Sequence, residues 1–231
     1  MIQLLSEMQN NNAINVENSI NSGQVFLWRK NGDYWYGVNG QDILRIDNSG
    51  KIKSYQNTKT DFFRKKDNMD EILKSISKDN TTRKAVKKYH GLRILNQDPF
   101  QCLISFIVSS NSNIQKIKTS LEKMSRKFGT KVEFENQEFF LFPNPKKLAK
   151  ASINEIKNCG VGYRAKFIKE AANMIFSKKI DFESLKKSNY LETKESICSI
   201  PGVGNKVADC IMLFSLNKLE AFPLDRWMIR I

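Results

Sequence analysis

Between residues 22 and 56, apolar and polar side chains alternate over short distances, as they do in half-buried β-strands. Four short runs stand out, namely QVFLWRK, YWYGVN, DILRIDN and KIKSYQ, and NGD, NGQ and NSG separate them. Such Asn-Gly and Ser-Gly turns favour tight hairpins between antiparallel neighbours. The segment therefore predicts a small antiparallel sheet whose apolar side chains include Phe26, Trp28, Trp35, Ile43 and Leu44.

From about residue 60 the apolar spacing lengthens to the period of helices. It predicts helices over residues 70–78, 81–90, 100–110, 113–129, 164–179, 189–200 and 205–216, and another after a proline-marked loop within 142–151. We therefore expect an α+β protein, with a sheet domain over residues 1–92 and a mostly helical domain over residues 93–231. The final FPLDRWMIRI resembles the opening of a helix, so we expect the helical domain to continue beyond residue 231.

The charge balance adds information about partners. The chain has 38 Lys and Arg against 24 Asp and Glu, which gives a formal net charge of +14. Such an excess favours a polyanion as partner, although a basic protein with a lysine-rich surface would look the same. The longest apolar runs, such as CLISFIV and CIMLF, are too short to span a bilayer, so we expect no membrane partner.

Cysteine and histidine are too few and too scattered for familiar metal sites. The cysteines stand at 102, 159, 198 and 210, a spacing that fits neither paired zinc ligands nor an iron–sulfur run. Cys102 and Cys210 lie in apolar runs, where a reduced core cysteine is the ordinary interpretation. His90 is the single histidine, which leaves little material for a multi-histidine site.

The stretch SIPGVGNKVADC, residues 199–210, predicts a helix, a tight glycine turn and a second helix. A glycine turn that opens onto a helix leaves backbone N–H groups free to meet a phosphate. Gly202, Val203 and Gly204 would supply those groups, and in a chain this basic the natural occupant is a nucleic-acid backbone. The alternative is a plain turn between two core helices.

Lys206 stands in the first turn of the second helix, where the dipole is unfavourable to a cation. Cys210 and Phe214 follow at four-residue intervals and share its face, while Val207 and Ile211 lie on an adjacent apolar stripe. Burial and the helix start both disfavour the ammonium, and a neutral lysine is a nucleophile that can form a Schiff base. The alternative is a solvated surface lysine.

Asp225 follows Pro223 in PLDRW, where a carboxylate suits a helix start. A carboxylate could also stabilise positive charge that develops on a sugar under attack. An Asp at a helix start is ordinary by itself, and its combination with the hairpin and Lys206 in one short stretch favours the chemical role.

The sequence at these residues resembles the helix–hairpin–helix DNA glycosylases, and within them the 8-oxoguanine DNA glycosylases. PGVGNKVADC and AFPLDRW match the hairpin and catalytic segment of that family. SGQVFLW (22–28), SSNSNI (109–114) and GVGYRAKFI (160–168) match in the same order, so the resemblance spans nearly the whole chain. It implies excision of 8-oxoguanine opposite cytosine, then cleavage of the abasic strand by β-elimination.

The resemblance also implies roles on the lesion side. Lys206 would attack C1′ of the damaged nucleotide and form the Schiff base, and Asp225 would stabilise the oxocarbenium-like sugar. Gly23 would accept, through its backbone carbonyl, the N7 hydrogen that oxidation adds to guanine. Cys210 and Phe214 would flank the extruded base, although Cys210 alone is as easily a core residue.

Further implied roles concern the opposite strand and the hairpin. Asn111 and Arg164 would contact the orphaned cytosine, and Tyr163 would wedge into the gap in the stack. By themselves, Asn111 could instead cap the helix near 113, and Tyr163 and Arg164 could be a helix-start aromatic and a surface charge. Lys116 stands where close relatives carry an arginine for the cytosine, which leaves the stringency for the opposite base open. The backbone carbonyls of Cys198, Ile200 and Val203 would hold a cation against a DNA phosphate.

We therefore expect a monomer that acts on double-stranded DNA containing 8-oxoguanine and requires no cofactor, with a monovalent or calcium ion at the hairpin when DNA is bound. Its location would be the cytoplasm, with the nucleoid in a bacterium or archaeon, or the nucleus in a eukaryote. Two rival functions stay open: a monofunctional alkylbase DNA glycosylase, which would not need Lys206, and a non-catalytic module that uses the hairpin only to bind DNA.

Overall fold

An antiparallel sheet of four strands occupies the N-terminal part of the chain. The computed structural model describes residues 13–58, 60–225 and 228. Its strands are β1 (Trp28–Asn31), β2 (Tyr34–Asn39), β3 (Asp42–Ile46) and β4 (Ile52–Ser54), and they lie in sequence order. The predicted meander is confirmed, with each strand beginning or ending within a few residues of its predicted limits.

One face of this sheet packs on the helix α1 (Val16–Asn21) and on a phenylalanine pair, Phe62 and Phe63. Trp28 lies opposite Gly37 in the strand register and stacks on Phe62 at 5.1 Å between ring centroids. A Cβ at Gly37 would lie 2.0 Å from the Trp28 ring, so only glycine leaves room for the indole. This contact holds the start of β1, which follows the Gly23 loop.

The other face of the sheet carries a second hairpin, which the sequence did not predict. Its strands are β5 (Lys131–Phe134) and β6 (Gln137–Phe140). Phe139 stacks on Tyr36 at 5.9 Å, and Glu135 at the turn forms an ion pair with Arg45 at 2.9 Å. The segment KVEFENQEFF mixes acidic and aromatic residues without a clean alternation, so its strands become evident only through these partners.

Helices make up the rest of the molecule. Their bounds are α2 (Met69–Ile76), α3 (Asn80–Lys88), α4 (Pro99–Ser109), α5 (Ile114–Phe128), α6 (Pro145–Lys150), α7 (Ile153–Ile156), α8 (Arg164–Phe176), α9 (Phe182–Lys187), α10 (Tyr190–Cys198) and α11 (Asn205–Ser215), with a π-helical turn (Lys157–Val161) between α7 and α8. The eight predicted helices are confirmed, whereas α1, α7, α9 and the π-helical turn were not predicted. The α+β class is also confirmed; the division between residues 92 and 93 stays a prediction.

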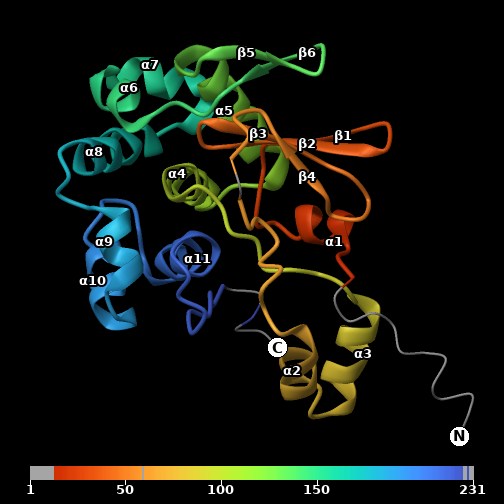
Figure 1. The fold of residues 1–231 in the computed structure, drawn as a ribbon. Coiled ribbons are helices and arrows are strands. Elements are labelled where there is room, and N and C mark those ends of the chain that lie inside the picture. The colour runs from red at the N-terminus through yellow and green to blue at the C-terminus, as the bar shows by residue number, and fades with distance from the viewer. Residues whose placement is uncertain (1–12, 59, 226–227, 229–231) are drawn as a thin grey trace, which may run out of the picture.

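Helix α4 runs through the middle of the molecule, between the four-stranded sheet and α11 (Figure 1). Asp98 caps it by accepting from the backbone N–H of Gln101, and Pro99 occupies its first position. Almost all of its side chains are buried, from Phe100 to Val108. The Gln101 side chain ties it to the sheet by accepting from Gly40 N and donating to Val38 O, both at 2.7 Å. The side chain of Gln101 therefore connects α4 directly to the sheet.

Within the described residues, none of the helices combines the length and the apolar character that crossing a membrane requires.

Candidate active site

The predicted helix–hairpin–helix is formed by α10 and α11, which lie beside each other and are joined by residues 199–204 (Figure 1). Gly202 has a φ of +84°, in the left-handed region that suits glycine, and Val203 N donates to Ile200 O at 3.0 Å. A Cβ at Gly202 would lie 2.7 Å from the Phe167 ring of α8. The turn is therefore fixed by close packing against α8.

The N-terminus of α11 has no side-chain cap. Gly204 stands at its N-cap position and makes no side-chain hydrogen bond, whereas Asn189 caps α10 and Asn113 caps α5. The first N–H groups of a helix lack partners within the helix and attract anions. This arrangement fits the predicted contact between the hairpin and a DNA phosphate, with Gly202 and Gly204 exposed beside it.

Lys206 and Cys210 lie together on α11, as their spacing predicted. Lys206 is half-buried, and its Nζ lies 5.3 Å from the centre of the Phe106 ring. Burial raises the pKa of the Cys210 thiol to about 11, while the charge and the side-chain hydrogen bond of Lys206 act in the opposite direction. The neighbouring stripe, with Val207 and Ile211, is buried as expected.

Asp225 lies near the same thiol. Its negative charge is the smallest of the causes that act on the raised pKa of Cys210. Asp225 Oδ1 also accepts from the backbone N–H of Met228 at 3.0 Å, the contact that a carboxylate makes at a helix start. The structure thus brings Lys206 and Cys210 together on α11, and a position of the Asp225 carboxylate beside the Lys206 amine stays a prediction.

The Gly23 loop is held against the end of α11. Gly23 has a φ of +85°, and a Cβ there would meet nothing within 4 Å, so its backbone borders open space. Gln97 makes the connection: its side chain donates to Gln24 O and its backbone N–H donates to Phe214 O, both at 2.8 Å. Gly23 and Phe214, predicted to contact the base, therefore belong to one neighbourhood.

Two glutamines and a phenylalanine of this site were not predicted. Gln24 is buried, donates to Arg93 O at 3.0 Å and accepts from Leu95 N at 2.8 Å, so it fixes the loop beside Gly23. Phe106 of α4 stacks on Phe214 at 5.7 Å and also faces the amine of Lys206. Nothing in the apolar run that contains Phe106 singles it out, because only the fold tells which side of a buried helix faces the site.

The residues predicted to serve the opposite base also lie together. Asn111 is exposed and has a φ of +49°. The cap of α5 is Asn113, whose Oδ1 accepts from Lys116 N at 2.9 Å, so the alternative interpretation of Asn111 as that cap is wrong. Tyr163 is 63% exposed and contacts Phe167 edge to face at 6.1 Å, which suits a wedge.

Arg164 is not placed as an exposed base-reading group. It is only 6% exposed, and its guanidinium donates to the backbone carbonyls of Ser110, Asn111 and Val161. The alternative of a plain surface charge is therefore wrong, and a direct contact between Arg164 and a cytosine stays a prediction.

A partly buried ion pair joins the two helices of the hairpin motif. Lys194 of α10 lies 2.8 Å from Asp209 of α11, and Tyr190 donates to the same carboxylate at 3.1 Å. The hydrogen bond to Asp209 is the main cause that raises the pKa of Lys194. Asp209 precedes Cys210, so this pair fixes the side of α11 that lies behind the site. The only sequence signal for this ion pair is Asp209, a single acidic residue among the apolar residues of α11.

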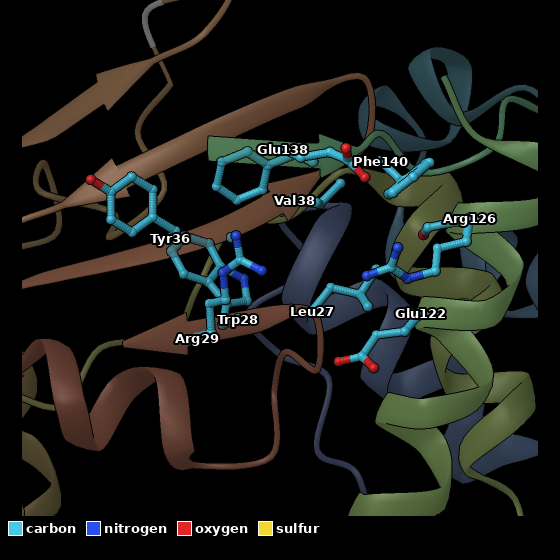
Figure 2. A pocket seen from close by; sticks show the side chains of 12 residues that line it. Leu27, Trp28, Arg29, Tyr36, Val38, Glu122, Arg126, Glu138 and Phe140 are labelled. Atoms are coloured by element: carbon cyan, nitrogen blue, oxygen red, sulfur yellow. The ribbon is translucent and has the colours of Figure 1, made fainter. Parts of the chain in front are cut away.

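A separate cleft of about 240 Å³ lies between the sheet, α5 and β6, and Figure 2 shows its lining. Arg29 and Arg126 contribute their guanidinium groups, and Glu122 and Glu138 their carboxylates. None of the predicted site residues lines this cleft. Among the described residues, no cluster of three His, Cys, Asp or Glu side chains could hold a metal ion.

Comparisons with known proteins identify the family of this fold. Residues 7–103 match the family model of the 8-oxoguanine DNA glycosylase N-terminal domain, and residues 104–231 match that of the HhH-GPD superfamily of base excision DNA repair proteins. The chain is 32% identical over 229 residues to the N-glycosylase/DNA lyase OGG1 of Arabidopsis thaliana, covering 90% of this chain and 63% of that relative. The chain thus spans less than two thirds of that relative's length.

Solved structures show the same fold. The 8-oxoguanine glycosylase/lyase of Clostridium acetobutylicum, in complex with double-stranded DNA that has cytosine opposite 8-oxoG, superimposes with a TM-score of 0.86 and 31% identity, covering 94% of this chain and 78% of that one. A 3-methyladenine DNA glycosylase from Archaeoglobus fulgidus reaches a TM-score of 0.73 at 18% identity, a likeness of fold alone. The chain belongs to the HhH-GPD superfamily of base excision DNA repair proteins, in its 8-oxoguanine DNA glycosylase family.

Proposed function

We propose that this protein removes 8-oxoguanine from duplex DNA opposite cytosine and then cuts the abasic strand by β-elimination. The observation that carries the proposal is the placement of Lys206 next to Cys210 with its amine over the ring of Phe106. A half-buried lysine amine in the first turn of a helix is suited to attack a sugar carbon and to form a Schiff base. The rival alkylbase enzyme has no use for the lysine.

In the proposed reaction, the lone pair of the Lys206 amine attacks C1′ as the bond from C1′ to the base breaks. The departing base takes the bonding electrons and a proton, while Asp225 stabilises the positive charge that develops on the sugar. The amine then loses a proton, its lone pair forms the C1′=N bond as the C1′–O4′ bond breaks, and O4′ takes up a proton from water, which gives the Schiff base. Abstraction of a C2′ proton then expels the 3′ phosphate, which is β-elimination.

The lesion must leave the helix stack to reach this amine. Cys210 and Phe214 flank the extruded base, and the Gly23 carbonyl accepts the N7 hydrogen that normal guanine lacks. An unpaired buried carbonyl facing normal guanine would cost about 1–3 kcal/mol. Gln24 and Gln97 hold that carbonyl in place through the bonds described above.

The hairpin is proposed to bind the DNA backbone through the N–H groups of Gly202 and Gly204, because the N–H of Val203, predicted with them, donates to Ile200 O at 3.0 Å. A monovalent or calcium ion would bind the carbonyls of Cys198, Ile200 and Val203 once DNA is present. Cys198 ends α10, where the last carbonyls lack partners within the helix, and backbone oxygens suit such hard cations. We propose a monomer that works wherever the genome is kept, in the cytoplasm or nucleoid of a bacterium or archaeon, or in a eukaryotic nucleus.

A single-turnover assay on three duplexes tests the proposal: 8-oxoguanine opposite cytosine, 3-methyladenine opposite thymine, and undamaged DNA. Base release and strand cleavage are measured separately. We expect free 8-oxoguanine and a cut strand from the first duplex alone. Release of 3-methyladenine without strand cleavage would favour the alkylbase enzyme, and binding of all three duplexes without base release would favour the DNA-binding module.

A further inference from the structure

Asp209 is a buried acid on the helix that carries Lys206. It lies three residues after Lys206 and is only 6% exposed. Both of its carboxylate oxygens accept from Lys194 Nζ of α10, at 2.8 and 3.0 Å. Tyr190 donates to the same carboxylate at 3.1 Å, and its hydroxyl accepts from Lys194 Nζ at 3.2 Å. Two side chains of α10 therefore engage this acid together.

Lys206 is a second cation that could pair with Asp209. Residues three apart on a helix are neighbours, so rotation of the Lys206 side chain could bring its amine to the carboxylate. Among the described residues, however, the ion pair of Asp209 is with Lys194. The Lys206 amine instead lies 5.3 Å from the centre of the Phe106 ring and bonds to the Cys210 thiol. The two lysines thus have different partners.

The charge of Asp209 nevertheless acts on the site. Burial is the main cause that raises the pKa of Cys210, and the charge of Asp209 acts in the same direction. Without Lys194, this carboxylate would be a buried charge without a partner, a costly state that attracts the nearest cation. An ammonium held in an ion pair keeps its proton and has no lone pair with which to attack a sugar.

We propose that Lys194 is a positioning residue for the Schiff-base reaction. With Tyr190, it holds the Asp209 carboxylate away from Lys206, so that the Lys206 amine is free to lose its proton and attack. Lys194 acts through Asp209 and needs no contact with DNA. The inference rests on the proposed function, because it concerns the amine that is proposed to form the Schiff base.

Other titratable groups face this cluster from α4, α10, α11 and the segment after α11. They are Cys102, Cys198, Cys210 and Asp225. Burial raises the pKa of all three thiols, so they carry no charge at neutral pH. Two lysines therefore compete for the carboxylate of Asp209, and the contribution of Asp225 is common to wild type and to each variant of Lys194 and Asp209.

Borohydride trapping on a duplex with a ready-made abasic site measures how readily the Lys206 amine reacts with a sugar. In Lys194→Met at pH 7, adduct formation should slow about tenfold, because a carboxylate beside an amine favours its charged form by at least that factor. Lys194→Arg keeps a cation for Asp209 and should react nearly as fast as wild type. The matched control is Lys131→Met, which breaks an exposed ion pair with Glu138 away from α11 (Figure 1). An unchanged rate in Lys194→Met would overturn the proposal.

The pH dependence of acetylation separates this role from a loss of structure. Acetylation of Lys206 in the DNA-free protein, mapped by mass spectrometry, follows the fraction of free amine. Lys194→Met should react about tenfold more slowly than wild type at pH 7, and the difference should close towards pH 10 as base removes the proton in both proteins. A deficit of the same size at every pH would indicate altered structure and overturn the proposal.

The double variant Lys194→Met/Asp209→Asn covers the case in which Lys194→Met does not fold. It removes both charges, and neutral side chains can often replace a buried ion pair without loss of stability. Its Lys206 should be acetylated at the wild-type rate at pH 7, because Asp209 is already withheld in wild type. A clearly different rate would show that the acid acts on Lys206 in the intact protein, and it would overturn the proposal.

These measurements distinguish failure of this inference from failure of the proposed function. If wild type forms no adduct with abasic DNA at any pH, the proposed function fails. The acetylation rates need neither DNA nor a reaction, so they still decide what Lys194 does to Lys206.

Discussion

At the scale of single residues, the site depends on an amine, a thiol and a carboxylate that influence one another. Lys206 and Cys210 are one helical turn apart, and the charge of Asp225, beyond α11, is a minor contribution to the raised pKa of the same thiol. The spacing of Lys206, Cys210 and Phe214 could be predicted because the geometry of a helix fixes it. The role of Phe106 could not be predicted, because this residue lies about a hundred residues before Lys206 and contacts Lys206 and Phe214 only through tertiary packing.

Asp225→Asn should separate the two steps of the reaction. The change removes the negative charge that stabilises the sugar cation, so excision of 8-oxoguanine should slow by about 100-fold or more. Lys206 remains, so borohydride trapping on a duplex with a ready-made abasic site should fall much less. Single-turnover rates on the two substrates measure this difference. Equal losses on both substrates would assign Asp225 to the Schiff-base step instead.

Cys210 should make the protein sensitive to alkaline pH. Burial raises its pKa to about 11 from an ordinary value of 9.0. Between pH 9 and pH 11 the thiol of the unfolded chain loses its proton, whereas the thiol of the folded protein keeps it. The contribution of Cys210 to the free energy of unfolding is therefore complete below pH 9 and is lost as the pH rises towards 11. Urea unfolding between pH 8 and 11 should therefore show a shallower decline in Cys210→Ala than in wild type. Parallel curves would mean that the thiol ionises equally in both states.

At the scale of elements, the hairpin, α8 and the loop before α5 form a connected set. Gly202 packs on Phe167, Phe167 contacts Tyr163, and Arg164 holds the Asn111 loop. The ends of α10 and α11 were predicted within a residue or two because glycine and proline mark the turn. The contact of the hairpin with α8 was not predicted, because no local sequence pattern shows which helix a turn will pack against.

The two glycines of the hairpin should respond differently to alanine. Gly202→Ala places a Cβ 2.7 Å from Phe167 at a φ of +84°, which should cost at least about 1 kcal/mol and lower the melting temperature by a few degrees. A Cβ at Gly204 would meet nothing within 4 Å, and the φ of −94° is open to alanine, so Gly204→Ala should keep its stability. Its affinity for duplex DNA should fall, because the hairpin at Gly204 is proposed to bind phosphate. Thermal unfolding measures the stability of each variant, and DNA titration measures its affinity for duplex DNA. Unchanged DNA affinity in Gly204→Ala would contradict the phosphate-binding role.

At the scale of the whole molecule, two of the basic residues line a groove near the loops predicted to serve the opposite base. A groove of about 480 Å³ beside the start of α5 is lined by Lys116, Lys123 and Gly160, and it adjoins the loops that carry Asn111 and Tyr163. The net charge of +14 pointed to a polyanion, but composition could not say where it would bind. The fold class followed from the change in apolar period near residue 60. The β5–β6 hairpin escaped prediction because its stability comes from contacts with Tyr36 and Arg45 of the sheet.

Affinity for undamaged duplex should fall steeply with salt, and part of that dependence should come from this groove. Each of Lys116→Gln and Lys123→Gln should lower the slope of log affinity against log salt by about 0.9, the value for one phosphate contact. Lys84→Gln is the matched control, because α3 lies far from α5 and α8 (Figure 1) and its lysine is exposed. A slope that falls equally in all three would show that only net charge matters.

Borohydride trapping on a duplex with 8-oxoguanine opposite cytosine examines the central chemistry most directly. If an amine of α11 becomes bonded to the sugar, wild type should yield a reduced covalent adduct whose linked peptide contains Lys206. The Lys206→Gln variant should yield no adduct, and circular dichroism checks that this variant is folded. An adduct that persists in the folded Lys206→Gln protein, or that maps to another lysine, would contradict the account.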